Sequence, residues 1–374
     1  MKPRRVVLAF GVAALAALPA ACSLLYGDYG NDFQGKDASA KDGIAADGPD
    51  ADVSAEASTV LVAEDASITT VAVTTSAVFY SIGGQLLSVL LDGGGRSAVW
   101  TGDGGALAVV NALTSDGVSN LAWSYGDSQN NTIFLAAASA PGMPARIAHG
   151  QAYGGALAAD DASVVWNTTQ ETPDANGNPI LEIYDWHPVG GPMPIVFKAS
   201  PRLDAGSRPT AFGALAVALS PASVYSFIAN AGVVRFARED RTQQCEAHIG
   251  IPNHYIALAA GPTDLYVVAN PTKSGYGTLT RYEVGADGGC PASDEGTPLE
   301  TDDVVLVAAD ATGVYWVTTK GDVERELAGK GDAAHELGTM VTSPAAMAID
   351  DTYVYVAAGT DISRFPKHPV DTDP

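Results

Sequence analysis

Candidate catalytic and metal-binding residues are few and widely spaced in this chain. Three cysteines and six histidines are scattered over 374 residues, so their spacing predicts no facial set of metal ligands. Paired carboxylates occur at Asp160–Asp161 and Asp350–Asp351, both in expected turns, where aspartate is favoured for its own backbone hydrogen bonds. The motifs of serine hydrolases, zinc proteases, phosphate-binding loops and C-x-x-C redox sites are absent. The sequence therefore predicts no catalytic residue, no metal site and no cofactor.

The cysteines predict a lipid anchor and a disulfide. If Cys22 carries a lipid, Cys245 and Cys290 remain as an even pair in an oxidising compartment. Equivalent points on neighbouring sheets should lie roughly 10 Å apart, whereas a disulfide needs Cα atoms about 4.4 to 6.8 Å apart, so the flanking loops would have to close that gap. The alternative is a zinc site that adds His248 and His254, although the long separation to Cys290 disfavours it.

The first 22 residues are expected to be an export signal. Lys2, Arg4 and Arg5 precede an apolar stretch, 6–18, that is too short to span a bilayer. Small residues and Cys22 close the segment, and this end resembles the lipobox of bacterial lipoproteins, in which the cysteine becomes the lipidated first residue. Ordinary cleavage just before it is the alternative. The sequence predicts an exported protein, lipid-anchored at the outer membrane or cell surface, or else periplasmic.

Composition predicts a disordered tether followed by an acidic body. The chain has 43 Asp and Glu against 20 Lys and Arg, and loss of the signal takes its net charge from −23 to −26. Such a surface repels phosphate backbones and anionic lipid heads, so nucleic acid is excluded as a partner and membrane contact is expected through the lipid alone. Residues 23–58 are rich in Ala, Asp and Gly and have too few apolar groups to offset the entropy of ordering them, so they should be a disordered linker. The alternative is that their acidic residues bind calcium, although no D-x-D-x-D-G run is present.

Seven copies of one phrase recur along the chain. Each copy joins small apolar residues, an acidic or polar turn, and an aliphatic residue followed in most copies by an aromatic one. The second members of these pairs lie 43, 43, 60, 41, 49 and 40 residues apart, at Phe79, Ala122, Val165, Tyr225, Tyr266, Tyr315 and Tyr355. A period of roughly 40 to 50 residues built from short strands is typical of a β-propeller. The sequence therefore predicts an all-β fold, a seven-bladed β-propeller over residues 59–366, with a disordered tail at 367–374.

The ends of the repeat region predict how the ring closes. The last copy stops after its third strand, Asp361–Phe365, because two prolines follow. The segment Thr59–Glu64 stands alone before the first copy, in the place of a fourth strand. Pairing these two segments would close the circle and remove two exposed edges.

Two copies carry a family resemblance. The phrase at 314–317 with 321–325, and its echo at 354–356 with 361–364, resembles the Y-W-T-D class of propeller repeats, although the final Asp is missing and that family commonly has six copies. The whole chain is similar to uncharacterised bacterial repeat lipoproteins with an acidic linker before such a propeller. The resemblance implies a binding or scaffold role with no catalytic residues.

Loop lengths predict where a partner binds. The connections between second and third strands are long in three copies, and long loops on a rigid scaffold commonly carry function. Amide, carboxylate and aromatic side chains on one face are therefore the candidate ligand residues: Tyr125, Asn130, Asn131, Asp174, Asn176, Trp186 and Tyr276. The alternative is that they are solvated hairpin tips.

Two functions from different classes remain open. The first is a monomeric, non-enzymatic binder or scaffold that recognises an envelope protein, peptide or glycan. The second is a glycan lyase or hydrolase, which requires two acids about 5 to 9.5 Å apart at the central mouth. The first strands are rich in Ala, Val and Leu, which favours the binder.

Overall fold

The computed structural model describes residues 58–103, 108–127, 131–151, 156–168, 181–187, 195–199, 216–228, 232–238, 243–247, 254–270, 277–284, 296–328, 334–339 and 343–368. The chain divides into two compact units, and all described residues belong to the second, Val53–Pro374. In these ranges the chain forms strands and no helix that is long and apolar enough to cross a membrane.

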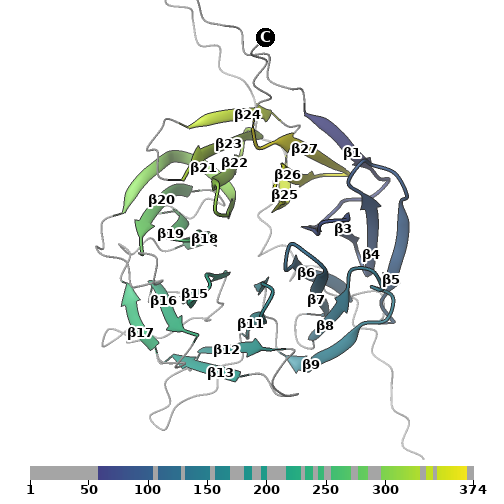
Figure 1. Ribbon diagram of the computed structural model, residues 1–374, viewed down its shortest axis with the longest axis horizontal. Helices are drawn as coiled ribbons and strands as arrows, with labels where there is room; N and C mark the ends of the chain where they lie inside the picture. Colours follow the sequence, from purple (N-terminus) through teal and green to yellow (C-terminus); the bar gives the residue numbers. More distant parts are fainter. Residues whose placement is uncertain are drawn as a thin grey trace, which may run out of the picture. The chain divides into compact units, whose positions relative to one another are not determined.

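The described strands pair into six antiparallel sheets (Figure 1). The first two contain β2 (Thr70–Val73), β3 (Ala77–Ile82), β4 (Gln85–Leu90) and β5 (Ser97–Thr101), then β6 (Val109–Ser115), β7 (Asn120–Gly126), β8 (Asn131–Ala137) and β9 (Ala145–Gln151). The next two contain β10 (Leu157–Ala159), β11 (Val164–Thr168), β12 (Leu181–Trp186) and β13 (Ile195–Ala199), then β14 (Val217–Leu219), β15 (Ser223–Ile228), β16 (Gly232–Ala237) and β17 (Gln243–Ala247).

The remaining two sheets differ from this pattern. A seven-stranded sheet contains β18 (His254–Ala260), β19 (Asp264–Asn270), β20 (Gly277–Glu283), β21 (Thr297–Ala309), β22 (Gly313–Thr318), β23 (Asp322–Leu327) and β24 (His335–Thr339). The last sheet contains β25 (Pro344–Ile349), β26 (Tyr353–Ala358), β27 (Asp361–Pro366) and β1 (Thr59–Ala63).

The long strand β21 belongs to two neighbouring groups of strands. Its first part, up to Glu300, pairs with β20, and its second part, from Val304, pairs mainly with β22. Between them, Asp303 has a φ of 70°, a left-handed conformation that turns the chain. The seven-stranded sheet therefore consists of two four-stranded groups joined through one continuous strand.

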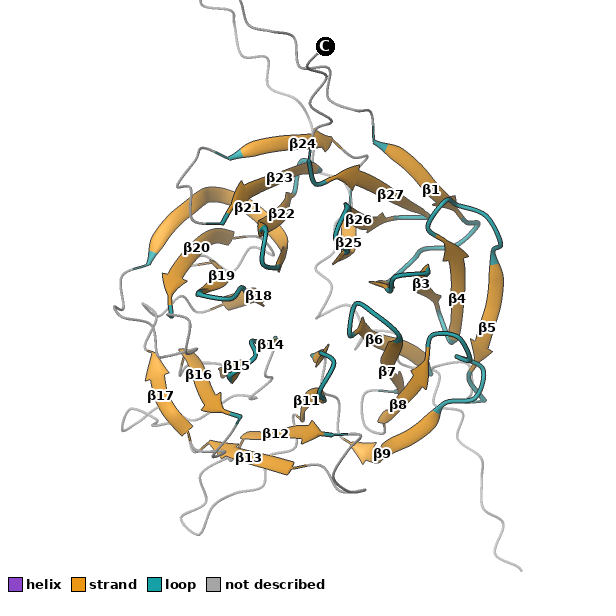
Figure 2. Cartoon of the chain, in the orientation of Figure 1, coloured by secondary structure: helices purple, strands orange, loops and turns teal. Residues whose placement is uncertain are grey.

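The first strands of successive groups contact one another in a closed order: β2, β6, β10, β14, β18, β21, β25 and again β2. Figure 2 shows the groups set around a common centre, with β1 outside β27 in the last group. Each hydrophobic cluster combines residues of two neighbouring groups; one brings Trp123 of β7 against Phe79 of β3. Second-strand aromatics such as Trp166, Trp316 and Tyr355 are fully buried, as expected for packing groups. Burial of one large apolar side chain stabilises the fold by about 1.5 to 3 kcal/mol.

The strand β1 pairs antiparallel with β27, with Thr59 opposite Arg364 and Ala63 opposite Asp361. A bulge between Val60 and Val62 interrupts the alternation of side chains, so Leu61 and Val62 are both buried while Val60 is 56% exposed. The segment Thr59–Ala63 therefore contributes apolar surface to the core as well as backbone hydrogen bonds to the last sheet.

The residue after β1 fixes this strand to the first sheet. Arg96 donates two hydrogen bonds to the Glu64 carboxylate, at 2.6 and 2.7 Å, and Tyr80 donates a third at 2.5 Å. The Glu64 N–H donates to the carbonyl of Thr360 in the last sheet, at 3.0 Å. The hydrogen bond from Arg96 holds the pKa of Glu64 below its usual value. Glu64 thus joins both ends of the repeat region.

Candidate functional site

Two of the predicted loop residues are buried anchors. Tyr125 is the last residue but one of β7, and its ring packs on Gly102, where a Cβ atom would lie 2.0 Å from the ring. Asn131 begins β8; its Nδ2 donates to the Asp127 carbonyl, and its Oδ1 accepts from Asn111 Nδ2, both at 2.7 Å. These contacts hold the two ends of the loop. Ligand contact by Tyr125 and Asn131 stays a prediction.

The other predicted residues are placed only in part. Trp186 ends β12 and packs half-buried against the cluster between the second and third sheets. Cys245 lies in β17, and its bond to Cys290 stays a prediction. In the described part of the chain, no three His, Cys, Asp or Glu side chains are grouped to hold a metal ion. The remaining predicted residues lie outside the described ranges: Cys22, Asn130, Asp174, Asn176, Tyr276 and Cys290.

The first strands that surround the centre are apolar. The strands β2, β6, β10, β14 and β25 and the second part of β21, 304–309, carry no ionisable side chain, and β18 carries His254 and Tyr255. No Asp or Glu therefore occurs in β2, β6, β10, β14, β18 or β25, or in β21 from residue 304 onward. The pair of carboxylates that the enzyme alternative requires is not found there.

Polar groups gather instead at the turns that join first to second strands. The first residue of each turn differs among the seven repeats: Thr74, Asp116, Asp160, Ser220, Gly261, Asp310 and Asp350. Where it is aspartate, its carboxylate accepts backbone N–H groups further along the turn. Asp160 Oδ1, for example, accepts from Ala162 and Ser163 at 3.0 and 2.8 Å. Such bonds explain the aspartates as turn formers.

The residue that follows each third strand lies close to these turns. The seven residues at this position are Leu91, Ala138, His187, Arg238, Val284, Ala328 and Lys367. In several repeats its N–H donates to a carbonyl of the turn in its own repeat, as Arg238 does to Ala222 at 3.0 Å and Lys367 to Thr352 at 2.8 Å. Its side chain is therefore placed to reach the turn of the preceding repeat.

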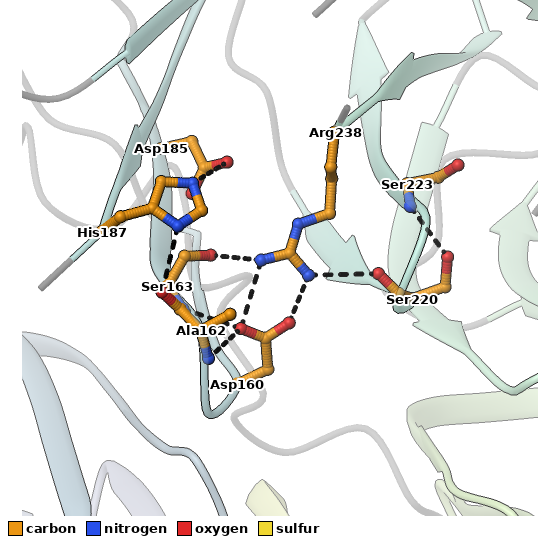
Figure 3. Close-up of polar contacts among 8 residues, drawn as sticks. All are labelled: Asp160, Ala162, Ser163, Asp185, His187, Ser220, Ser223 and Arg238. Carbon is orange, nitrogen blue, oxygen red and sulfur yellow. Dashed lines mark hydrogen bonds and ion pairs between the residues drawn. The ribbon is translucent and has the colours of Figure 1, made fainter. Parts of the chain in front are cut away.

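Two basic residues at this position clamp neighbouring repeats together. Arg238 binds both carboxylate oxygens of Asp160 and donates to Ser163 Oγ at 2.7 Å (Figure 3). Lys367, which is fully buried, binds Asp310, and its ammonium lies 4.8 Å from the centroid of the Tyr315 ring. The described contacts thus extend past Pro366, to Lys367 and to His368, whose Nδ1 lies 3.4 Å from Arg325 Nη1. Each clamp joins the turn of one repeat to the third strand of the next.

The two positions match in residue type along the chain, and they form ion pairs at two junctions, Asp160 with Arg238 and Asp310 with Lys367. Where a turn begins with Thr74, Ser220 or Gly261, the residue that follows the third strand of the next repeat is alanine or valine. Turns that begin with Asp116, Asp160 and Asp310 are followed by His187, Arg238 and Lys367. Asp350 is the exception: Leu91 follows it, and the Asp350 carboxylate accepts from Tyr355 Oη at 2.8 Å. Sequence analysis missed these partners, although aligning the repeats with each other would have found them.

The clamps also set the ionisation of the turn aspartates. Burial raises the pKa of Asp310, but the hydrogen bonds from Lys367 Nζ and Thr312 and the positive charge of Lys367 together outweigh it and hold the pKa below the usual value. The same balance, with Arg238 as the donor, lowers the pKa of Asp160. Both carboxylates are therefore held as anions, and neither is suited to act as a general acid.

His187 does not form a clamp. Its Nε2 lies 3.1 Å from Asp185 Oδ2, and its Nδ1 lies 3.1 Å from the carbonyl oxygen of Ala162 (Figure 3). Because both ring nitrogens are engaged, neither is available to take a proton from Ser163, whose Oγ accepts from Arg238. The Asp185, His187 and Ser163 side chains are thus not arranged as a nucleophilic triad. The network ties the third sheet to the fourth.

Comparison with known proteins supports the fold. No protein-family profile and no curated protein sequence matches the chain. Similar solved structures include the WD40 β-propeller domain of Doa1 (12% identity, 83% of this chain and 97% of that one, TM-score 0.60) and a chain of the Mitotic Checkpoint Complex (10%, 87% and 99%, 0.59). BamB from Moraxella catarrhalis is a third (13%, 80% and 85%, 0.50). At these identities the likeness concerns the fold alone, and it shows that the chain folds as a β-propeller.

Proposed function

We propose that this protein is a non-enzymatic binder or scaffold of the cell envelope, which recognises a protein, peptide or glycan through the face that carries its long loops. One observation carries the proposal. The turn carboxylates Asp160 and Asp310 are engaged by Arg238 and Lys367 in holding repeats together, while most side chains of the described first strands are apolar. Such a frame is rigid and offers its loops for recognition.

The scaffold is proposed to be a seven-bladed propeller that β1 closes. The closed order of contacts among seven first strands supports the number of blades, as does the division of β21 between two groups. The pairing of β1 with β27 and the Glu64 contacts support the closure. The pairing of β1 covers the edge that β27 would otherwise expose and leaves only short outer edges, which suits an exported protein that must not aggregate.

The location of the protein is proposed from its sequence. A lipid on Cys22 would hold the protein at the outer membrane or cell surface, with 23–58 as a flexible tether, and a periplasmic form is the alternative. The net charge of −23 disfavours direct contact of the propeller with anionic lipid heads. The protein is expected to act as a monomer.

Shortening the longest predicted loop tests this function. Asn167 and Thr168 lie in β11, where Thr168 pairs with Glu182, so the loop is removed without changing the register by replacing 169–181 with a two-residue Asn-Gly hairpin. This change should abolish capture of envelope proteins and glycans, because the rigid frame would lose its main recognition element. The measurement is cross-linking capture from envelope extracts with the tagged full chain, followed by mass spectrometry and a glycan array. Lys320→Ala, in the short hairpin between β22 and β23, serves as the control and should capture as the parent does.

Two results would contradict the proposal. One is unchanged capture by the shortened variant while its thermal unfolding matches that of the parent. The other is cleavage of a glycan by the purified parent, which would establish the lyase or hydrolase alternative.

A further inference from the structure

Arg325 of β23 is a buried cation with no counter-ion among the described residues. The residue is 6% exposed, and its side chain lies on the same face of β23 as Val323, which packs between the sixth and seventh repeats. The Asp310 carboxylate at this junction is bound by Lys367 instead. A buried charge without a counter-charge is strongly destabilising. An anionic group is therefore expected beside Arg325.

The donors of Arg325 that remain unused show which group would fit. Nη1 donates to the carbonyl oxygen of Lys367 and lies 3.4 Å from His368 Nδ1. Nε is fully buried and has no hydrogen-bond partner among the described residues, and Nη2 donates to none of them. The Nε and Nη2 hydrogens point in parallel from one side of the guanidinium, a geometry that matches the two oxygens of a carboxylate.

The chain uses the same pair of donors at a second arginine. Arg96 donates from Nε to Glu64 Oε1 at 2.6 Å and from Nη2 to Glu64 Oε2 at 2.7 Å. That pair closes on a carboxylate although the Arg96 side chain is 55% exposed. Arg325 is far more buried, so its need for a carboxylate is greater.

The chain directly beyond this site is acidic. Residues 369–374, which lie outside the described ranges, read Pro-Val-Asp-Thr-Asp-Pro and carry two aspartates and no basic residue. The first of them, Asp371, follows His368 by three residues, a stretch that spans at most about 11 Å when extended. Because the His368 ring already lies beside the guanidinium, the carboxylate of Asp371 is within reach of it.

A carboxylate of the same chain is favoured over one from solution. The net charge of −23 repels free anions, whereas a tethered group has a high effective concentration at the site. We propose that Asp371 pairs with Arg325 and holds the C-terminal segment against the junction between the sixth and seventh repeats. The predicted disorder of the tail would then apply only beyond Asp371. The last repeat would be held by β1 at its outer edge and by this pair at its junction with the sixth.

Exchange of the Arg325 Nε proton with water tests the pair. The signal is followed by NMR in the full chain and assigned by through-bond experiments. Asp371→Asn should speed this exchange about tenfold, as expected when a charge-assisted hydrogen bond is weakened. Residue 371 lies outside every described strand, so the variant is expected to fold.

The tail offers a matched control. Asp373→Asn makes the same change of charge two residues later and should leave the exchange rate unaltered. Unchanged exchange in the Asp371→Asn variant would overturn the proposal, and equal acceleration by both substitutions would overturn it in favour of general attraction of an acidic tail. Slower exchange in the parent on addition of sodium acetate would also overturn it, because the two donors would then serve a carboxylate from solution.

Discussion

Replacing Val62 by aspartate is expected to lower the free energy of unfolding by on the order of 4 kcal/mol. Val62 is 6% exposed and packs with Leu61 and Ile362 in the cluster between the first and last sheets. A carboxylate there would be buried without a partner, which is among the most costly changes a core can suffer. Chemical denaturation followed by circular dichroism would measure the loss.

The same strand supplies the control. Val60→Asp makes an identical change two residues earlier, at a side chain that is 56% exposed, and should change the free energy of unfolding by less than about 0.5 kcal/mol. Equal effects of the two substitutions, whether both small or both large, would contradict the packing of β1 against the last sheet. Aggregation of the Val62→Asp variant at its sheet edge would agree with that packing.

Replacing Asp310 by asparagine is expected to lower the free energy of unfolding by about 3 kcal/mol, the lower end of the range for breaking a buried ion pair. Asp310 is 28% exposed, which reduces the cost, but its partner Lys367 is fully buried and would lose its carboxylate. Asparagine retains the oxygen that accepts the backbone N–H groups of the turn, so the change isolates the charge. Thermal and denaturant unfolding would measure it.

Asp351→Asn, at the exposed second position of the equivalent turn in the last repeat, should be nearly neutral. The double variant Asp310→Asn with Lys367→Met should recover part of the loss, because it removes the unpaired buried charge. A loss below about 0.5 kcal/mol in the single variant would show that the clamp does not hold the repeats together.

Much of the fold could be predicted because its signal is local and repeated. An acidic or polar turn followed by an aliphatic residue, as at Asp310 and Val314, is legible in one copy and recurs seven times. The aliphatic residues at 304–307 before this turn and the phrase at 314–317 after it lie within β21 and β22. Fusion of two strands into β21 was not predicted, because it depends on the conformation of Asp303 and on pairing with β20.

The polar network was harder to predict because its partners belong to different repeats. Asp160 and Arg238 are 78 positions apart, and nothing near either residue indicates the other. Asp160 was correctly interpreted as a turn former, but its second role appears only when the turn of one repeat is compared with the third strand of the next. Tyr125 and Asn131 show a second limit of prediction from sequence. Both lie beside a long loop, where a binding role is expected, yet both are buried. Sequence alone does not distinguish a loop residue that anchors from one that recognises.

A cross-link between β1 and β27 tests the central claim, that the first ordered strand closes the ring. Val60 and Ser363 are opposite each other, and opposed residues of antiparallel strands have Cα atoms about 4.5 to 5.5 Å apart, within disulfide range. The full chain with Val60→Cys and Ser363→Cys should therefore form an intramolecular disulfide on mild oxidation, seen by mass spectrometry of the digested protein. The control pair, Val60→Cys with Asp361→Cys, is out of register and should form it far more slowly. A folded protein that formed neither bond, or linked only between two chains, would contradict the closed propeller.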